Sequence, residues 1–266
     1  MSVASLLGHH VRLHRVPLVP LALGLALFEG VMTFVAGEPS VTRFLTSVLR
    51  SAPPELLALL NQDLLAGVSP RGIVGVGYTH PFALLMMGVW AVRVPSAALA
   101  GEVGRGTMDL LASRPVTRAA QVAAALLALL GGLAALALAA WLGTLAGLVL
   151  HPVEGVRASA YLPVAGALWA LFACFGTIGV LASALARESG PAIAWTSGIL
   201  AGSYVLDYAA RVWPRIAALR PLSLFRYYEP QSALAGGIAS ADMAVLAGVA
   251  AVSVTLAFAV FARRDL

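Results

Sequence analysis

The chain has 266 residues, of which 60% are hydrophobic and 11% are charged, whereas a soluble domain carries roughly 25% charged residues. All 17 basic residues are arginine, which excludes a P-loop ATPase, because that motif needs a lysine to hold the β- and γ-phosphates. The net charge of +5 favours contact with anionic lipid head groups, and no cluster of arginine and aromatic residues indicates nucleic-acid binding.

Six apolar runs are long enough to cross a bilayer, which takes about 20 residues per helix. The first run is longer than the apolar part of a signal peptide, so we expect it to stay in place. The single cysteine, Cys174, lies within the fourth run and excludes an intrachain disulfide. The sequence therefore predicts an all-α polytopic membrane protein with one transmembrane domain, residues 1–266, and six transmembrane helices at residues 16–36, 72–94, 119–150, 161–186, 191–212 and 243–262.

The segments outside these runs also carry patterns. Residues 2–15 are basic with interspersed apolar residues, which is typical of an N-terminal interfacial helix. Residues 40–66 form two amphipathic pieces, and prolines and aromatics in residues 213–240 predict a partly re-entrant loop. The run at 119–150 is too long for a perpendicular crossing, so it must tilt, project beyond the bilayer or bend at its two adjacent glycines.

Three ionisable residues fall within predicted spans: Glu29, His80 and Asp207. Charge at membrane depth is costly, so such residues usually face the bundle interior or a cavity, and all three are candidates for a pathway or an interface. Asp207 has a local partner one turn on, Arg211. His80 precedes Pro81 and could satisfy carbonyls that the helix break exposes. Glu29 is either a pathway or interface residue or a hydrogen-bonded structural glutamate.

Motifs for catalysis or metal binding are absent. The sequence contains no H-E-x-x-H and no G-x-S-G, so a zinc protease and a serine protease within the membrane lack support. His10 and His14 share a helical face, but we expect them to snorkel to the interface rather than to bind a metal. We therefore expect no catalytic residue and no metal site.

The loop between the second and third runs, residues 102–118, is the most specific segment. Gly104 and Gly106 interrupt any helix that continues from the second run, and Thr107 can N-cap a new one. Pro115 ends it, which leaves about two turns. Such a helix is marginal alone and needs a docking surface, unless it simply rests on the lipid interface. Its apolar side would carry Met108, Leu110 and Leu111, opposite Asp109.

This loop resembles the cytoplasmic segment of ABC-2 type transporter permeases, which reads Glu, Gly-Thr, paired leucines and then Pro-Val-Ser/Thr-Arg. The proline-rich aromatic segment at 221–230 and the Arg-Arg-Asp-Leu ending also resemble that family. One departure is Ala125, where such permeases often have a lysine. The matching residues are, in order, Glu102, Gly106, Thr107, Leu110, Leu111, Pro115, Val116, Thr117 and Arg118.

The resemblance implies a transport subunit and not an enzyme. Two copies, or one copy with a related permease subunit, would pair with two cytoplasmic ABC ATPase subunits that bind ATP and Mg²⁺, while this chain holds no cofactor. The short cytoplasmic helix would couple the ATPase to the spans, and export is the family's usual direction. The implied coupling residues are Glu102, Gly106, Thr107, Met108, Asp109, Leu110, Leu111, Pro115 and Arg118.

Orientation depends on the first span, because the arginines divide almost equally between the two sides of the predicted topology. The basic N-terminus favours a cytoplasmic start, so we expect both termini in the cytoplasm and the chain in the cell inner (plasma) membrane. The alternative function is that of another polytopic membrane protein without an ATPase partner, or of a self-contained secondary transporter. Such a protein should show broken spans in corresponding halves and several midplane charges, and this chain has few of either.

Overall fold

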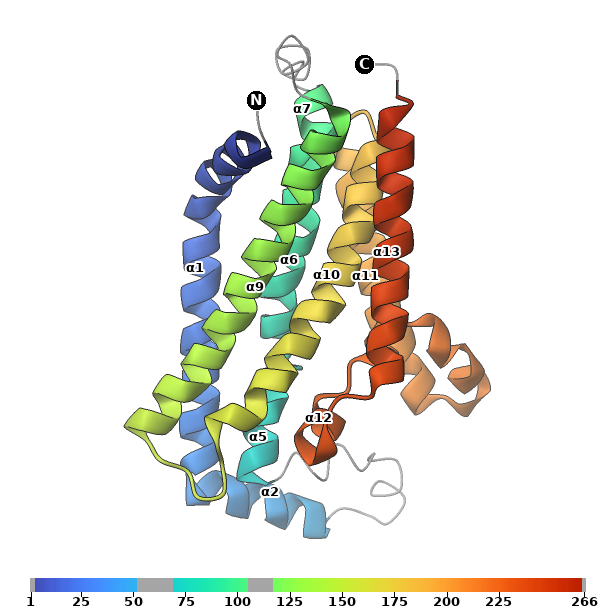
Figure 1. The fold of residues 1–266 in the computed structure, drawn as a ribbon. Coiled ribbons are helices and arrows are strands. Elements are labelled where there is room, and N and C mark those ends of the chain that lie inside the picture. The colour runs from blue at the N-terminus through green and yellow to red at the C-terminus, as the bar shows by residue number, and fades with distance from the viewer. Residues whose placement is uncertain (1–2, 52–68, 105–116, 265–266) are drawn as a thin grey trace.

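The computed structural model describes residues 3–51, 69–104 and 117–264, and within these ranges the chain is helical with no strand. Figure 1 shows the long helices side by side in one bundle, with α7 and both termini at one end and α2 at the other. The long helices are α1 (Val3–Gly37), α6 (Pro81–Ala98), α9 (Arg118–Leu150), α10 (Leu162–Leu185), α11 (Ser189–Val212) and α13 (Ser240–Ala262). The shorter elements are α2 (Pro39–Ser51), α5 (Pro70–Gly77), α7 (Ala100–Gly104), η1 (Ala158–Tyr161), η2 (Pro214–Leu222), η3 (Leu224–Tyr227) and α12 (Pro230–Gly236).

Helix α10 forms the centre of the bundle and packs against α6, α9, α11 and α13. Its side chains Leu168, Phe172 and Phe175 are fully buried. Helices α1 and α13 lie at the periphery and expose large apolar side chains such as Leu27 and Val252. Apolar surface on this scale is unfavourable in water and suits a bilayer.

Within the described residues, five segments are long and apolar enough to cross a membrane, and they coincide with five of the six predicted spans. The sixth, predicted at 191–212, is α11, which is a continuous helix of 24 residues and therefore about 36 Å long. It is not among the five because serines, glycines, Asp207 and Arg211 lower its hydropathy. The six-span topology therefore stays a prediction.

The predicted span at 72–94 is not one helix. Helix α5 ends at Gly77 and α6 begins at Pro81, since proline has no N–H to continue the helical ladder. The two helices form one apolar segment, Pro70–Ala98, with a break inside it. Non-helical backbone at membrane depth is tolerated only where protein or a cavity surrounds it.

The structure also differs from prediction at the N-terminus, where no separate interfacial helix forms. Helix α1 is continuous from Val3 to Gly37 although it contains Pro17 and Pro20. Each proline removes one backbone hydrogen bond and favours a bend. The first turns of α1 accordingly lean away from the rest of the helix in Figure 1.

The third apolar run, which is too long for a perpendicular crossing, forms α9. This is a single uninterrupted helix of 33 residues that is inclined in the bundle. It packs closely on α1 through two glycines. A Cβ on Gly143 would lie 2.7 Å from the Cα of Ala26, and one on Gly147 would lie 2.7 Å from the Cβ of Thr33. Small residues four apart allow two helix backbones to approach in this way.

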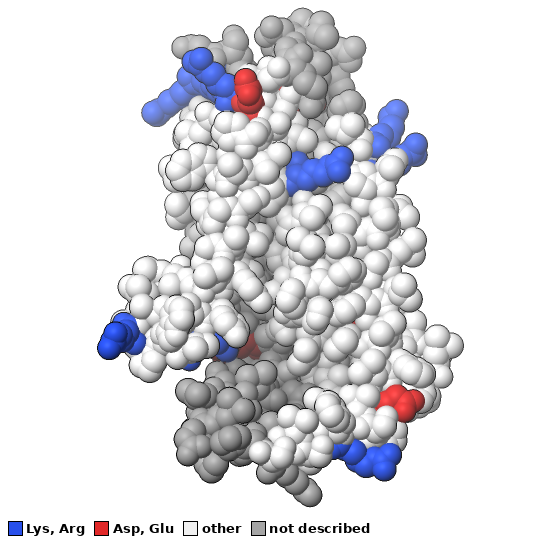
Figure 2. All heavy atoms as spheres, turned by 180° about the vertical axis from the view of Figure 1, so that it is seen from behind, with Lys and Arg blue, Asp and Glu red and all other residues white. Residues whose placement is uncertain are grey.

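Charged residues avoid the middle of the molecule. On the face shown in Figure 2, arginine and acidic residues gather toward the two ends and an uncharged band lies between them. This distribution is the one expected of a protein whose centre lies in hydrocarbon and whose ends reach the head groups.

Candidate functional site

The described flanks of the predicted coupling segment lie at the α7 end of the bundle. Seven of its nine residues lie outside the described residues: Gly106, Thr107, Met108, Asp109, Leu110, Leu111 and Pro115. The other two flank that stretch. Glu102 is buried in α7, and Arg118 is the first residue of α9. The Thr117 hydroxyl caps α9 by accepting a hydrogen bond from the Ala120 N–H at 3.2 Å.

Arg118 ties the start of α9 to the end of α13. Its Nη1 donates to the carbonyl oxygen of Ala262 at 3.2 Å, and also to the carbonyl oxygen of Arg264. The last carbonyls of a helix have no partner within it, and an arginine is a suitable cap because it also complements the helix dipole. The loop's final arginine is thus part of the packing of the last span.

Two further contacts join this end of the bundle. Arg264 Nη1 donates to the carbonyl oxygen of Ala184 at 3.0 Å, near the end of α10. The Ser183 hydroxyl accepts from the Ala100 N–H at 2.9 Å, at the start of α7. Burial, and secondarily the charge of Arg187, lower the pKa of Arg264.

We call this group of residues the loop platform: Ala100–Gly104, 117–118, 183–188, 261–262 and Arg264. Gly104 completes it, because a Cβ there would lie 3.5 Å from the Arg187 carbonyl oxygen. Both ends of the predicted coupling segment are therefore attached to α10 and α13. A displacement of that segment would act on several long helices at once.

Glu29 lies inside the protomer, where α1 meets the end of α5. Its side chain is fully buried, and among the described residues neither carboxyl oxygen has a hydrogen-bond partner. A Cβ on Gly77 would lie 2.9 Å from the Glu29 Cδ, so only glycine fits there without displacing the carboxyl group. The site excludes water, and burial of a charge without a partner is costly, so it suits the neutral acid.

Three buried tyrosines lie within electrostatic range of Glu29, but their hydroxyls bond elsewhere. Tyr78 pairs with the Thr144 hydroxyl at 2.9 Å, and Tyr161 donates to the Arg71 carbonyl at 2.7 Å. Tyr228 donates to the Tyr78 carbonyl at 3.0 Å. These bonds connect α5, α9 and η1 with the residue that follows η3.

His80 occupies the break between α5 and α6 and caps α6. Its Nδ1 accepts a hydrogen bond from the Phe82 N–H at 3.2 Å. His80 therefore satisfies a backbone amide, whereas the sequence had suggested that it would satisfy a carbonyl. In a continuous helix that amide would bond the Tyr78 carbonyl. The Tyr228 hydroxyl takes its place, so a residue more than a hundred positions away completes the break.

Asp207 is part of an ion-pair network. The predicted pair with Arg211 is confirmed, with Nε 2.8 Å from Oδ2. Arg220 also reaches Asp207, at 3.0 Å, and bridges to Glu229 at 3.0 Å. Arg226 completes the network through Glu229 at 3.0 Å. The network holds η2 and η3 against α11, so Asp207 is placed with the connecting segment and not beside Glu29 or His80.

His10 and His14 do not snorkel to the interface. Both are buried, their rings stack with centroids 6.1 Å apart, and His14 meets the edge of Trp90 at 5.9 Å. Their shared helical face is the one that α1 turns toward α6. Within the described ranges no group of three or more histidine, cysteine or acidic residues is arranged to hold a metal.

The sequence did not reveal the roles of Tyr228 and Arg264. Both act across long sequence separations, on Tyr78 and on Ala184. The only local signals were an aromatic segment rich in proline and a basic C-terminus.

Comparison with known proteins gives one finding. The family model described as ABC-2 family transporter protein matches residues 18–266. No curated protein matches the chain. The match covers the first predicted span from residue 18, the other five predicted spans, the loop at 102–118 and the loop platform, so the chain belongs to the ABC-2 transporter family and is a transport membrane protein.

Proposed function

We propose that this chain is the permease subunit of an ABC exporter and that a separate subunit hydrolyses the ATP. The segment 102–118 would bind that ATPase, which would hold ATP and Mg²⁺. Both termini would lie in the cytoplasm, and the bundle would cross the cell inner (plasma) membrane. The absence of lysine from the sequence supports the division of labour, because the P-loop lysine must come from another chain.

The loop platform is the observation that carries the proposal. Arg118 holds the end of α13, Arg264 holds the end of α10, and α7 bonds to Ser183. A push from a docked ATPase would therefore reach two membrane helices directly through hydrogen bonds. This is a geometric requirement for coupling hydrolysis to a rearrangement of the spans.

A second permease subunit would pack on α11. This helix exposes small residues at successive intervals of four, Gly190, Ala194, Gly198 and Gly202, and the three glycines have open space where a Cβ would point. Such rows promote close helix pairing in membranes. The low hydropathy of α11 favours a protein neighbour over lipid for this face.

Deletion of Gly106–Ser113 tests the coupling role in the complex reconstituted with the cognate ATPase subunit. We expect the complex to fail to assemble, or to hydrolyse ATP without transport, while the spans still insert. Arg118→Gln is the finer variant and should lower transport per ATP hydrolysed. Arg263→Gln is its control, since Arg263 is an exposed arginine at the same end. Full transport after the deletion would contradict the proposal and favour a self-contained transporter.

Cysteine cross-linking tests the pairing face. In a Cys174→Ala background, Gly198→Cys should form a disulfide between two permease copies in native membranes, or with a related subunit that carries a cysteine at the matching position. Leu256→Cys on the exposed side of α13 serves as the control. Equal cross-linking at both positions would indicate random collision and not a specific interface.

A further inference from the structure

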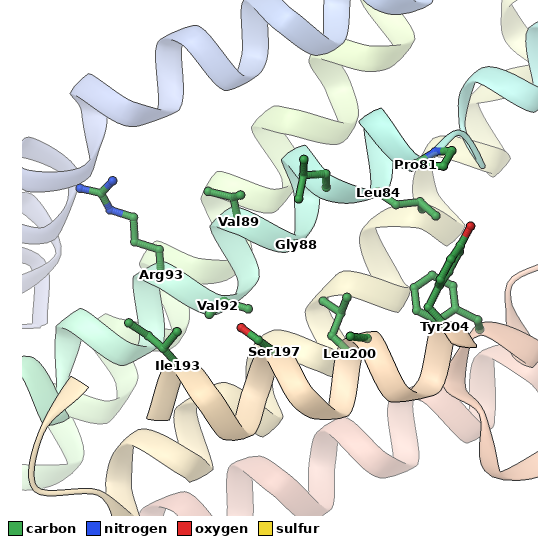
Figure 3. Close-up of a pocket in the computed structure, with 13 residues that line it drawn as sticks. Pro81, Leu84, Gly88, Val89, Val92, Arg93, Ile193, Ser197, Leu200 and Tyr204 are labelled. Atoms are coloured by element: carbon green, nitrogen blue, oxygen red, sulfur yellow. The ribbon is translucent and has the colours of Figure 1, made fainter. Parts of the chain in front are cut away.

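An apolar groove separates α6 from α11. Its volume is about 510 Å³, within the range of about 300–1,000 Å³ typical of small-molecule sites. Figure 3 shows side chains of both helices facing each other across it, with Ser197, Leu200 and Tyr204 rising from α11. The groove is lined by Pro81, Leu84, Leu85, Gly88, Val89, Val92, Arg93, Ile193, Ser197, Leu200, Ala201, Tyr204 and Phe225.

One end of the groove is closed and apolar. Tyr204 meets Phe225 edge to face with ring centroids 5.3 Å apart, and Phe225 also packs on the buried rings of α10. The long side is open, because Leu85 and Ile193 are 60% and 42% exposed. A ligand would thus enter sideways from the hydrocarbon layer and not from water.

The other end carries Arg93, the only charged residue among the described residues of the lining. Arg93 is exposed, and within the described ranges it makes no ion pair. Its stem lines the groove while its guanidinium points away from α11 in Figure 3. Arg93 lies five residues before the end of α6, a depth of about 7 Å from which a long arginine reaches the head-group layer.

The length of the groove matches that of an acyl chain in one leaflet of the bilayer. Pro81 and Arg93 are twelve residues apart on α6, which is about 18 Å, and one leaflet contributes about 15 Å of hydrocarbon. A single acyl chain can therefore extend from the closed end to Arg93. Its head group then meets a guanidinium, which pairs well with a phosphate oxygen.

We propose that the groove between α6 and α11 binds one acyl chain of an anionic phospholipid, with its head group held by Arg93. The site goes beyond the proposed transport function and does not depend on the ATPase partner. Because Arg93 is positively charged, the site favours an anionic phospholipid over a zwitterionic one. The apolar lining distinguishes it from a water-soluble anion, which would gain nothing from the groove.

Native mass spectrometry of the purified full-length chain tests the site, with phosphatidylglycerol and phosphatidylcholine of identical acyl chains as the two probes. We expect the parent protein to retain phosphatidylglycerol about fivefold better, which is roughly the effect of one basic side chain at an anionic surface. Arg93→Gln should abolish this preference. Ala201→Phe, or Ser197→Phe if the first variant fails to fold, should fill the groove and lower retention of both lipids.

Two controls match these variants. Arg263→Gln removes another exposed arginine at the α7 end, and Val252→Phe enlarges an exposed side chain of α13. Both should behave like the parent protein. Equal retention of the two lipids by the parent, or unchanged binding by Arg93→Gln and the filled groove, would overturn the proposal. So would a complete disulfide between copies at Ala201→Cys, because a second copy would then cover the groove.

Discussion

At the scale of single residues, Glu29 is defined by what surrounds it. It is fully buried, it touches Gly77, and the hydroxyls of Tyr161 and Tyr228 donate to other groups. Since the site suits a neutral group, we expect Glu29→Gln to change the free energy of unfolding by less than about 0.5 kcal/mol. Glu29→Ala should cost about 2–3 kcal/mol, because it leaves a cavity beside Gly77.

Thermal unfolding of the purified variants measures both effects. If Glu29→Gln were as unstable as Glu29→Ala, the carboxylate would be ionised and paired in the native protein. The pathway or interface role predicted for Glu29 is tested separately, by measuring transport in the complex that carries Glu29→Gln. Its position between α1 and α5 would make any such role one of helix movement and not of direct substrate contact.

Two adjacent tyrosines offer a matched test of the helix break. The Tyr228 hydroxyl is buried and satisfies the Tyr78 carbonyl, so Tyr228→Phe leaves a buried acceptor without a partner. We expect a loss of about 1–3 kcal/mol in the free energy of unfolding. Tyr227 donates to the Pro221 carbonyl at 2.8 Å in an exposed setting, where water can replace it. Tyr227→Phe should therefore be nearly neutral, and equal losses would contradict the assigned bond.

At the scale of helices, α9 contains its own control for close packing. Gly143 faces the backbone of Ala26 on α1, whereas nothing lies within 4 Å of a Cβ on Gly131. Gly143→Ala should push α1 away and lower the melting temperature. Gly131→Ala should be neutral or stabilising by about 0.5–1 kcal/mol, since alanine favours the helix. A similar fall in both variants would indicate a general effect of glycine removal and not helix contact.

The helices also show what the sequence could predict. Length and hydropathy located five segments that form helices long and apolar enough to cross a membrane, because hydropathy is a property of a whole run and tolerates error at each residue. Local ion pairs such as Asp207 and Arg211 could also be predicted from the sequence, since their spacing is one helical turn. The break before Pro81 was expected from the proline, although hydropathy shows only one span there, because the apolar run continues on both sides of the break. Pro17 and Pro20 lie inside an unbroken helix, so the presence of a proline does not by itself show where a helix breaks.

The contacts that build the candidate site were not predictable from local pattern. Arg118 lies 144 residues from Ala262, and Arg264 lies 80 residues from Ala184. Their pairing depends on which helix ends meet at the α7 end, and that is a property of the packed bundle. Likewise, His10 and His14 had the basic, amphipathic setting of interfacial residues. The bend of α1 places His14 against Trp90 instead, and His10 stacks on His14.

At the scale of the whole molecule, the expected orientation in the membrane rests on a difference between the two ends of the bundle. The arginines are nearly balanced between the ends, but the basic start of α1, the loop platform and both termini all lie at the α7 end (Figure 1). The first span often dominates insertion, so we expect the α7 end in the cytoplasm. In that case α2 and the segment from η2 to α12 face outward.

Cysteine labelling decides this orientation. Ser51 is exposed at the end of α2, and Ser113 lies in the coupling segment. The native thiol, Cys174, is buried and is replaced by alanine as background. An impermeant reagent should label Ser51→Cys in intact cells, and it should label Ser113→Cys only after the membrane is opened. Since an ATPase can act only where ATP is available, the reverse pattern would place the segment 102–118 beyond the reach of a cytoplasmic ATPase.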